Sequence, residues 1–401
     1  MPDASYAKLR PAASVISRGT LPAETVVRIL RFVRPRRHAA APSTQRESTL
    51  TPATSHPDPS FWKALPKALL HEHLDGGLRP QTLLELCRVR GLDVPAQDAP
   101  ALADWMHANA YSGSLERYLR GFALTIAAMA SAEACERVAF EAAEDARLDG
   151  CVLAEFRIAP LLLEAHGLSG EAVVEALLSG LRRSALPSGL IVCAMRTDTP
   201  QETLRSAELA ARYQDAGVIG FDLAGAERGY PPAAHAPAFA RAREAGLGLT
   251  CHAGEADVGS RVLEAAALGA TRIGHGVNIM RGATPAQTAQ WVDQARALGL
   301  HFEVCASSNV HTGAAESLAA HPIRAMVEAG LSVSGSTDNR LMSGVTLSSE
   351  LQALHEQPGL SLAQLTQLMR NAVAASFLPA TVRELAMAAM TTAPEPKRFD
   401  I

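Results

Sequence analysis

Short apolar runs alternate along this chain with longer segments whose apolar residues recur at helical spacing. Eight of these runs have the length and composition of buried strands. They lie at residues 65–70, 151–158, 189–195, 218–223, 247–252, 271–274, 300–305 and 331–334. Helical patterns separate most of them, at residues 201–214, 235–245, 258–268 and 286–298. Strand–helix alternation predicts parallel strands, and eight repeats predict an α/β fold of the (β/α)8 TIM-barrel type.

Two further helical segments complete the expected architecture. A helical insertion spans about 79–149, after the first strand, with Leu83, Leu119 and Val138 among its recurring apolar positions. Residues 349–391 are expected to form extra C-terminal helices that close the fold. An open, doubly wound sheet is the alternative topology. No Gly-x-Gly-x-x-Gly turn follows the first strand, which favours the barrel.

The N-terminal part of the chain has a different composition. Residues 1–58 are rich in Pro, Ser, Thr, Ala and Arg, and they hold nine basic residues against four acidic ones. We therefore expect a disordered basic extension at 1–58, followed by one large domain at 59–401. A targeting peptide and a start codon placed too early are two further interpretations of the extension.

Composition and charge narrow the class of protein. The 401 residues are 48% hydrophobic and 19% charged, as in large globular proteins with a full core. A net charge of -4 gives no electrostatic reason to expect a nucleic acid partner. No apolar run approaches the ~18 residues that a membrane span needs. Six scattered cysteines without a Cys-x-x-Cys pair indicate reduced thiols and a cytoplasmic location. Nothing in the sequence indicates the oligomeric state.

Two histidines stand at the end of the first predicted strand. His71 and His73 are two residues apart, so on a strand their side chains share a face, about 7 Å apart in rise. Two neutral imidazoles placed in this way can bind one divalent metal, Zn²⁺ above all. An isolated His-x-His is also compatible with a pair of hydrogen-bonded core histidines, so the other strand ends decide the question.

Polar residues of the right kind end three later strands. His252 ends the fifth strand, with Glu255 just beyond it, His275 ends the sixth, and Asp338 ends the eighth. The C-terminal ends of the strands form the active-site rim of such a barrel. Taken alone, a rim Asp often caps the next helix, and a loop Glu is often only a solvated charge. Their coincidence at matching strand ends predicts a metal site.

These residue types suggest a division of labour for metal-assisted hydrolysis. Four side chains are expected to hold one zinc ion and to leave a position for water: His71, His73, His252 and Asp338. The metal would lower the pKa of that water from ~15.7 towards ~7. His275 would orient the water or take its proton, and Glu255 would hand a proton to the substrate. Residue chemistry alone does not identify the bond that is cleaved.

The motifs around these positions resemble the adenosine deaminases of the amidohydrolase superfamily. The likeness covers roughly 60–390 and its most specific part is His-Ala-Gly-Glu followed by Gly-His-Gly about twenty residues later. The motifs are His-Glu-His-Leu-Asp-Gly at 71–76, Glu-Phe-Arg at 155–157, Gly-Phe-Asp-Leu-Ala-Gly at 220–225, His-Ala-Gly-Glu at 252–255, Gly-His-Gly at 274–276, Ser-Ser-Asn at 307–309 and Thr-Asp-Asn at 337–339.

The resemblance implies a barrel with one zinc that deaminates a 6-aminopurine to its 6-oxo product. Glu255 would protonate purine N1, and His275 would assist the attacking hydroxide. The Gly225 backbone N–H would meet purine N3, and Asp75 would accept a hydrogen bond from a sugar hydroxyl. The helical insertion would help to cover the pocket. Three further motif residues are interpreted as mainly structural: Asp222, Glu155 and Arg157.

Two departures from the common family pattern concern substrate contacts. This chain has Thr-Asp-Asn-Arg-Leu at 337–341 where many members have Thr-Asp-Asp-Pro, and it is similar in this to a bacterial branch. Asn339 can donate to purine N7 without first being protonated, as an aspartate must be. Ala226 stands where many members have an aspartate. Both departures leave the predicted metal ligands unchanged.

The expected activity is zinc-dependent hydrolysis of adenosine, and of 2′-deoxyadenosine, to inosine or deoxyinosine and ammonia, in purine salvage. Adenine, aminodeoxyfutalosine and AMP are rival substrates, and the carboxylate of Asp75 argues against the phosphate of AMP. A phosphotriesterase-like enzyme would usually need a second metal ion and a lysine that bridges the two metals. This chain has no lysine at a late strand end. A barrel that only binds its ligand would be expected to lack at least one catalytic residue. The four predicted metal ligands, Glu255 and His275 are all present. The expected partner is therefore a small purine nucleoside.

Overall fold

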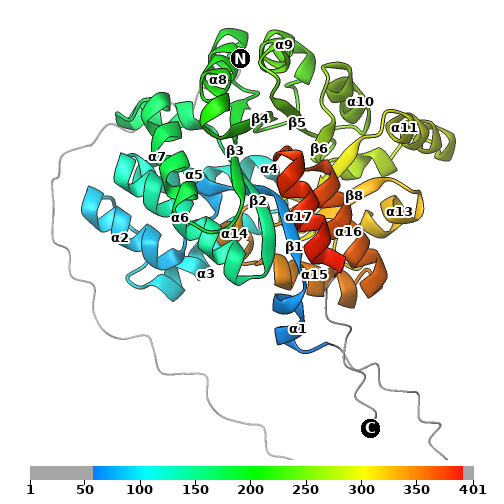
Figure 1. Cartoon of the computed structure of the whole chain (residues 1–401), viewed down its shortest axis with the longest axis horizontal. Coiled ribbons are helices and arrows are strands. Elements are labelled where there is room, and N and C mark those ends of the chain that lie inside the picture. The colour runs from blue at the N-terminus through cyan, green and yellow to red at the C-terminus, as the bar shows by residue number, and fades with distance from the viewer. Residues whose placement is uncertain (1–56, 392–401) are drawn as a thin grey trace, which may run out of the picture. The chain divides into compact units, whose positions relative to one another are not determined.

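Eight parallel strands form a barrel that helices surround (Figure 1). The computed structural model describes residues 57–391. The strands pair in chain order and are β1 (Lys67–His73), β2 (Cys151–Ile158), β3 (Ser188–Met195), β4 (Val218–Ala224), β5 (Gly248–Ala253), β6 (Arg272–His275), β7 (His301–Val304) and β8 (Ser332–Gly335). The predicted (β/α)8 fold is therefore confirmed.

The barrel closes at its C-terminal rim, through a residue just beyond β8. Asp338 forms an isolated parallel bridge with Glu72 of β1. Its N–H donates to the carbonyl of His71 at 2.9 Å, and its carbonyl accepts from the N–H of His73 at 2.8 Å. The backbone contact that closes the barrel thus joins the strand that carries two of the expected metal ligands to the residue that supplies another.

Helices lie before, within and after the barrel. The sequence predicted the helical insertion, four of the helices between the strands and the C-terminal helices, but not the helix that precedes β1. One helix precedes β1, namely α1 (Pro59–Ala64). The insertion after β1 holds the short turn η1 (Leu74–Gly76) and α2 (Pro80–Arg90), α3 (Ala99–Ala110), α4 (Leu115–Tyr118), α5 (Phe122–Met129) and α6 (Ala132–Leu148). The remaining helices are α7 (Gly170–Arg182), α8 (Pro200–Arg212), α9 (Ala236–Glu244), α10 (Ser260–Ala267), α11 (Pro285–Ala297), α12 (Ala306–His311), α13 (Ile323–Glu328), α14 (Arg340–Ser343), α15 (Leu347–Glu356), α16 (Leu362–Ala375) and α17 (Ala380–Thr391).

Local sequence signals set many of the helix ends. At α8 the Thr199 hydroxyl accepts from the N–H of Glu202, whose carboxylate accepts from the N–H of Thr199 in return. This capping box satisfies backbone donors that have no partner within the helix. At the other end of a helix, Gly91 stops α2 in the left-handed conformation, with φ 65°, which glycine adopts at little cost.

The first strand lies later in the chain than the apolar run at 65–70 suggests. It begins at Lys67 and includes His71, Glu72 and His73. Proline has no N–H for the strand ladder, so Pro66 stays outside it. The polar residues continue the strand because each meets a polar partner from another part of the barrel. The two histidines consequently stand on the strand itself, on one face, with Glu72 on the other.

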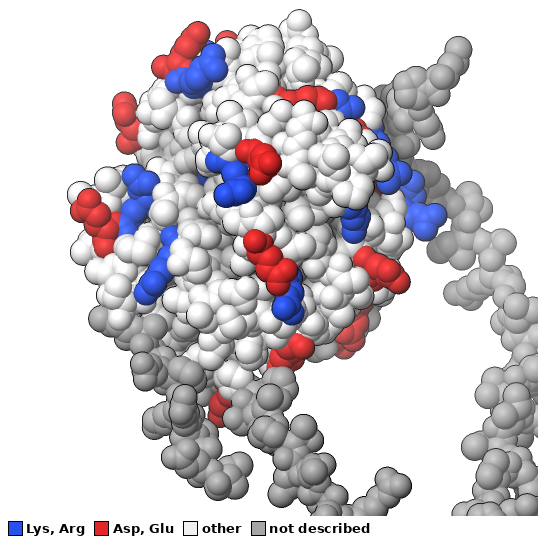
Figure 2. Space-filling view, turned by 90° about the vertical axis from the view of Figure 1, so that its right-hand side faces the viewer, with Lys and Arg blue, Asp and Glu red and all other residues white. Residues whose placement is uncertain are grey.

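The predicted extension at 1–58 lies outside the described residues except for its last two. Asp58 caps α1, since its carboxylate accepts the N–H of Ser60 at 2.8 Å. Within 57–391, no helix is both long and apolar enough to cross a membrane. On the face shown in Figure 2, basic and acidic side chains lie interspersed.

Candidate active site

Four side chains bring their ligand atoms together at the C-terminal rim of the barrel. They are His71, His73, His252 and Asp338, and one ligand atom of each lies within 4.8 Å of the others. Nε2 of His73 is 3.1 Å from Nε2 of His252, and Nε2 of His71 is 3.4 Å from Oδ1 of Asp338. Ligands of a tetrahedral zinc ion stand about 3.3 Å apart, given bonds of about 2.0–2.1 Å. The spacing therefore fits a single metal ion.

The electrostatics of this group also suit a cation. Nε2 of His71 is buried without a hydrogen-bond partner, which a bound cation would satisfy. Burial lowers the pKa of His73 well below its usual value and lowers that of His252, so their ring lone pairs are free. Burial acts to raise the pKa of Asp338, but contact with His71 and the charge of His275 hold it well below its ordinary range.

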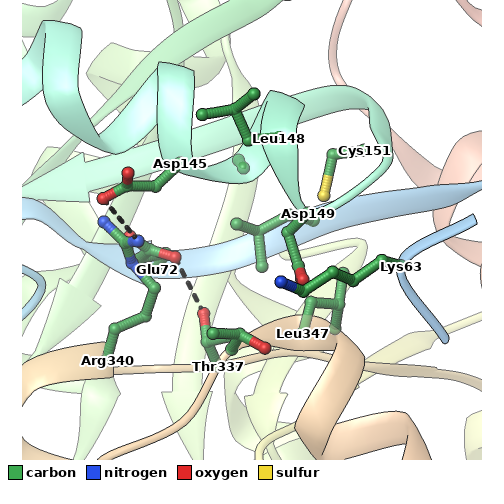
Figure 3. A pocket seen from close by; sticks show the side chains of 12 residues that line it. Lys63, Glu72, Asp145, Leu148, Asp149, Cys151, Thr337, Arg340 and Leu347 are labelled. Atoms are coloured by element: carbon green, nitrogen blue, oxygen red, sulfur yellow. Dashed lines mark hydrogen bonds and ion pairs between the residues drawn. The ribbon is translucent and has the colours of Figure 1, made fainter. Parts of the chain in front are cut away.

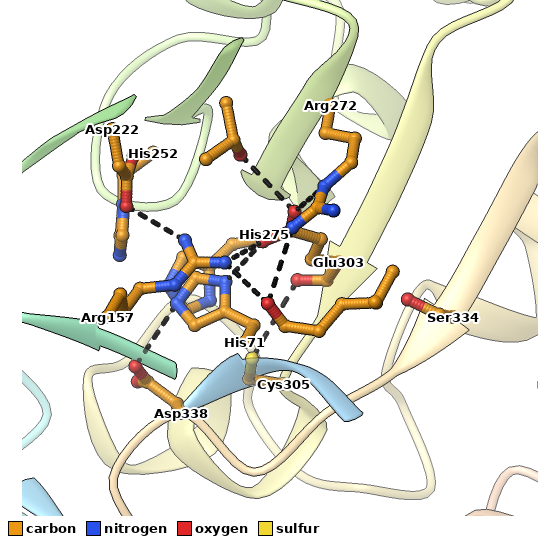
Figure 4. Close-up of polar contacts among 12 residues, drawn as sticks. His71, Arg157, Asp222, His252, Arg272, His275, Glu303, Cys305, Ser334 and Asp338 are labelled. Atoms are coloured by element: carbon orange, nitrogen blue, oxygen red, sulfur yellow. Dashed lines mark hydrogen bonds and ion pairs between the residues drawn. The ribbon is translucent and has the colours of Figure 1, made fainter. Parts of the chain in front are cut away.

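Two buried carboxylates orient the histidines (Figure 4). Glu303 of β7 accepts from Nδ1 of His71 at 2.9 Å, and Asp222 of β4 accepts from Nδ1 of His252 at 3.1 Å. Each contact directs Nε2 of the ring toward the ligand group. Carboxylates behind metal-bound histidines fix the ring tautomer and raise ligand basicity. Asp222, interpreted from the sequence as mainly structural, thus contacts a predicted ligand directly.

Two arginines hold these carboxylates inside the barrel. Arg157 donates to Asp222 at 2.8 Å and to Glu303 at 2.6 Å, and Arg272 links Glu303 to Glu155. Burial acts to raise the pKa of Glu303, but Arg157 and Arg272 hold it well below its usual value. The carboxylate of Glu303 is therefore ionised behind His71, and Arg157, expected to be structural, acts on the site through it.

Backbone strain is concentrated at two of the predicted site residues. Among residues 57–391, the non-glycine positions with positive φ are His275, at 62°, and Asp338, at 61°. This conformation costs of order 1 kcal/mol or more in a residue with a Cβ. The barrel-closing hydrogen bonds and the Ser308 hydroxyl, which donates to Oδ2 of Asp338 at 2.6 Å, hold the Asp338 side chain in place.

Glu255 lies in a loop that a second carboxylate organises. The carboxylate of Glu227 accepts four consecutive backbone N–H groups, those of residues 254–257. The Thr312 hydroxyl donates to Oε1 of Glu255 at 3.0 Å. Burial raises the pKa of Glu255 well above its ordinary value, and the charges of Asp338 and Glu227 add to this. These surroundings favour the protonated form of Glu255, which a proton donor to a substrate must adopt.

The remaining predicted residues surround the same space. His275 stands at the end of β6, with Nε2 3.7 Å from Oε2 of Glu255. Asp75 lies in η1, and burial raises its pKa to about 7. Oδ1 of Asp75 and Oδ1 of Asn339 are buried without hydrogen-bond partners. Gly225 follows β4 with φ 97°, and a Cβ there would lie 2.9 Å from Cε of Met195. The nine predicted residues thus gather around one rim.

The helical insertion reaches this rim through Tyr118. This residue of α4 is buried, and burial raises its pKa well above the usual value. The charge of Asp338 raises it further, whereas the side chains of Ser343, Ser308 and Asn339 lower it. The insertion therefore places an aromatic hydroxyl beside Asn339.

Behind β1 lies a second polar cluster, beside a cavity of about 240 Å³ (Figure 3). Glu72 points away from His71 and His73 and accepts from Arg340 at 2.5 Å and from the Thr337 hydroxyl at 3.0 Å. Arg340 also binds Asp145 of α6 at 3.1 Å. The arginine that replaces the proline of the common family pattern therefore ties the rim to the insertion.

Sequence reasoning missed several residues that support the site. Glu303 had one visible signal, an acidic residue within a short and mostly apolar run. Glu227 had none, because its partners lie in a loop that begins 27 residues later. Asn309 stood in a recognised motif, but no role was assigned to it. Each of them contacts a residue, or the loop of a residue, that the sequence did identify: His71, Glu255 and His275 respectively.

Comparison with known proteins supports this picture. The adenosine deaminase family model matches residues 66–391. The adenosine deaminase of Mycobacterium sp. (strain JLS) is 44% identical over 331 residues, which cover 78% of this chain and 91% of that protein. The adenosine deaminase of Mycobacterium bovis is 41% identical over 342 residues, with coverages of 81% and 93%.

Solved structures share the fold. An adenine deaminase from Arthrobacter aurescens matches with a TM-score of 0.74 and 25% identity, over 82% of this chain and 98% of that one. An N6-mAMP deaminase from arabidopsis matches with a TM-score of 0.73 and 25% identity, over 83% and 100%. With a family model that spans the whole barrel and relatives above 40% identity, the chain belongs to the adenosine deaminase family of hydrolases.

Proposed function

We propose that the protein hydrolyses adenosine, and 2′-deoxyadenosine, to inosine or deoxyinosine and ammonia, with one zinc ion held by His71, His73, His252 and Asp338. The observation that carries this proposal is the position of Glu255, a buried carboxyl whose surroundings raise its pKa, beside four side chains that could hold a metal ion. When bound, the zinc supplies a Lewis acid that activates water for addition to a carbon centre.

The protein's own groups account for the rest of the reaction. Glu255 gives its proton to purine N1 as water adds to C6, which makes the ring a better acceptor of the electron pair. The C6–N6 bond then breaks and C6 keeps the oxygen. Of the two protons that the water gives up, one reaches N6, which leaves as ammonia, and the other restores Glu255. Asn339 donates to N7 and the Gly225 N–H to N3. These contacts fix the purine in the plane in which Glu255 can reach N1.

Asp75 favours a nucleoside over free adenine. Its buried Oδ1 has no partner in the protein, and a sugar hydroxyl would supply one. Free adenine, the substrate in the name of the Arthrobacter relative, has no such hydroxyl. A pKa of about 7 leaves Asp75 partly ionised at neutral pH, which disfavours a 5′-phosphate. Aminodeoxyfutalosine, a modified nucleoside, is the alternative that keeps this contact.

Absorbance assays with purified protein test the proposal. Loss of the 6-amino group shifts the purine band, so adenosine, deoxyadenosine, adenine, AMP and aminodeoxyfutalosine can be ranked directly. We expect about one zinc per chain, and loss of turnover in a strong chelator that added Zn²⁺ reverses. Asp75→Ala should lower kcat/KM for adenosine while leaving any adenine turnover unchanged. Adenine or AMP as the best substrate would overturn the nucleoside assignment.

Glu255→Gln separates acid catalysis from metal binding. The amide cannot deliver the N1 proton, so turnover should fall by about 10²- to 10⁴-fold while zinc content stays at the wild-type level. His252→Ala is the matched variant and should lower zinc content, since it deletes a ligand. Near-normal turnover in Glu255→Gln would show that another group protonates the ring.

We further infer that the catalytic domain begins near residue 57 and that the protein is cytoplasmic. Every predicted site residue lies at position 71 or later, and Asp58 caps the first helix. All six cysteines are free thiols, as a reducing compartment requires. Removing residues 1–56 should leave kcat and KM nearly unchanged, and an insoluble or inactive product would show that the domain starts earlier.

A further inference from the structure

A line of three buried side chains leads from the start of α13 to the active site. His321 lies just before α13, Asn309 lies in α12, and His275 ends β6. Their exposed fractions are 4%, 0% and 1%. Nε2 of His321 is 3.2 Å from Oδ1 of Asn309, and Nδ2 of Asn309 is 3.0 Å from Nδ1 of His275.

The direction of these hydrogen bonds follows from a group that can only donate. The backbone N–H of Ile323 donates to Nδ1 of His321 at 3.1 Å. Nδ1 of His321 is therefore unprotonated, and a neutral ring must carry its proton on Nε2. Burial lowers the pKa of His321 to about 3, and the charge of Arg281 contributes. The ring is thus neutral at physiological pH, with Nε2–H as its one donor.

The same reasoning carries through Asn309 to His275. The group that accepts from Nε2–H of His321 must be the amide oxygen of Asn309, which turns the amide N–H₂ toward His275. Nδ1 of His275 accepts from this N–H and is therefore unprotonated. A neutral His275 then carries its proton on Nε2, the ring nitrogen on the side of Glu255.

We propose that His321 and Asn309 are positioning residues that hold His275 as its Nε2–H tautomer, so that His275 meets the oxygen that adds to C6 as a hydrogen-bond donor and not as a base. The proposal rests on the proposed function. It decides between the two roles that the sequence left open, because a nitrogen that already bears a proton cannot take one from water. A donor fixed in this place stabilises negative charge as it develops on that oxygen.

A purely structural role for the two residues would leave the tautomer of His275 unaffected, and nitrogen NMR distinguishes the two cases. Protonated and bare ring nitrogens differ widely in ¹⁵N shift, so zinc-loaded protein with ¹⁵N-labelled histidine reports the tautomer. His275→Ala identifies the His275 signals by their disappearance. In the wild type we expect a protonated Nε2 and a bare Nδ1 on His275.

Variants of His321 and Asn309 test whether their hydrogen bonds set the tautomer of His275. Asn309→Leu keeps the side-chain size but removes the N–H donor, so a Nδ1–H form of His275 should appear. His321→Ala should act in the same sense, because the Asn309 amide is then free to turn. His321→Gln should restore the wild-type tautomer in part, since its amide N–H can donate to Asn309.

Kinetics should follow the spectra. Asn309→Leu should lower kcat by about 10²- to 10³-fold, as the loss of one fixed donor does, with KM for adenosine and zinc content little changed. His301→Gln is the matched control, because His301 is another buried histidine with both nitrogens hydrogen-bonded, to Ser332 and Ser334. It should keep the wild-type His275 tautomer and kcat.

Three results would overturn the proposal that His321 and Asn309 fix the tautomer of His275. They are a wild-type His275 protonated at Nδ1, an unchanged tautomer in both Asn309→Leu and His321→Ala, or a fall in kcat without a change of tautomer. If Asn309→Leu does not fold, the His321→Ala and His321→Gln pair decides the matter alone. A wild type that binds zinc but leaves adenosine intact would refute the proposed function, whereas the NMR spectra judge the tautomer separately.

Discussion

Gly76 leaves the space that the side chain of Asn339 occupies. A Cβ at position 76 would lie 1.9 Å from Oδ1 of Asn339, far inside van der Waals contact. Gly76 ends the turn η1 after β1, and Asn339 follows the barrel-closing Asp338. The glycine of the first motif and the asparagine of the last therefore depend on each other, although 263 positions separate them.

Gly76→Ala should disrupt the proposed contact of Asn339 with the purine and leave the proposed zinc site unchanged. The new methyl group would force Asn339 away from N7, so kcat/KM for adenosine should fall by roughly 5- to 150-fold. Zinc content should stay at about one per chain. Overpacking of this kind should also lower the free energy of unfolding by about 1–3 kcal/mol. Steady-state kinetics and denaturant unfolding measure the two effects.

Gly121→Ala is the matched control for this prediction. Gly121 lies between α4 and α5, and a Cβ there would meet only the end of the Met342 side chain, with Sδ at an ordinary 3.4 Å. Its kcat/KM should stay near the wild-type value. Gly76→Ala with unchanged kcat/KM would show that Asn339 has another place to go, or that it does not contact the purine.

Glu303→Gln should weaken both the proposed zinc site and the fold. The amide cannot hold His71 as a carboxylate does, and losing such a partner typically costs 10- to 100-fold in metal affinity. It also leaves Arg157 and Arg272 short of a negative charge, so the free energy of unfolding should fall by about 3–5 kcal/mol. Zinc titration against a competing chelator and denaturant unfolding give the two numbers.

Glu155→Gln distinguishes these two effects. Glu155 is as deeply buried as Glu303 and also pairs with Arg272, but it contacts none of the predicted ligands. It should therefore destabilise the fold while leaving zinc affinity nearly unchanged. Equal losses of zinc affinity in both variants would mean that the buried ion network as a whole, and not the contact with His71, sets that affinity.

The sequence predicted the site because one geometric rule connects distant residues. The C-terminal ends of parallel strands meet at one rim of a barrel, so the sequence alone predicts that His71, His252 and Asp338 lie together. The same rule predicted the fold, since eight strand–helix repeats have few other arrangements. The family resemblance then assigned roles to Glu255 and His275, and the structure places both at the rim.

The supporting residues could not be predicted in this way. Glu303 contacts His71 across 232 positions, and no local pattern shows which ring a buried carboxylate will meet. The line from His321 to His275 depends on the direction of three hydrogen bonds, which only the placed atoms reveal. The end of β1 was also missed, because the polar residues that extend the strand find their partners in β5, β7 and the segment after β8.

His301 should make the fold more sensitive to acid. Burial lowers its pKa to about 3, and the charge of Arg272 contributes. The folded protein thus keeps His301 neutral while the unfolded chain takes up a proton below about 6.5. Since the unfolded state binds more protons, stability falls as pH decreases, by about 2 kcal/mol between pH 7.5 and pH 5 for this group.

His301→Gln removes this titration and so isolates its contribution. The difference in free energy of unfolding between wild type and variant should shrink by about 2 kcal/mol as pH falls from 7.5 to 5. Denaturant unfolding at the two pH values measures it. A difference that stays constant with pH would show that His301 is protonated to the same extent in both states.

Asn339 should read purine N7. In 7-deazaadenosine a C–H replaces that nitrogen, which leaves the Asn339 amide without an acceptor in a buried site. An unpaired buried donor costs about 1–3 kcal/mol, so wild-type kcat/KM should fall roughly 5- to 150-fold from this contact. Altered ring electronics add to that loss. Comparing variants on both substrates removes this common part.

Asn339→Ala should be slower with adenosine yet discriminate less against the 7-deaza analogue, because neither substrate then meets a donor. Asn339→Asp restores the common family residue, but it can donate only while its carboxyl is protonated. Its activity should therefore fall as pH rises, whereas that of the wild-type amide should not do so through this group. If Asn339→Ala kept the full preference for adenosine, Asn339 would not contact N7. The tight fit against Gly76 would then serve to hold the Asp338 turn and not the purine ring.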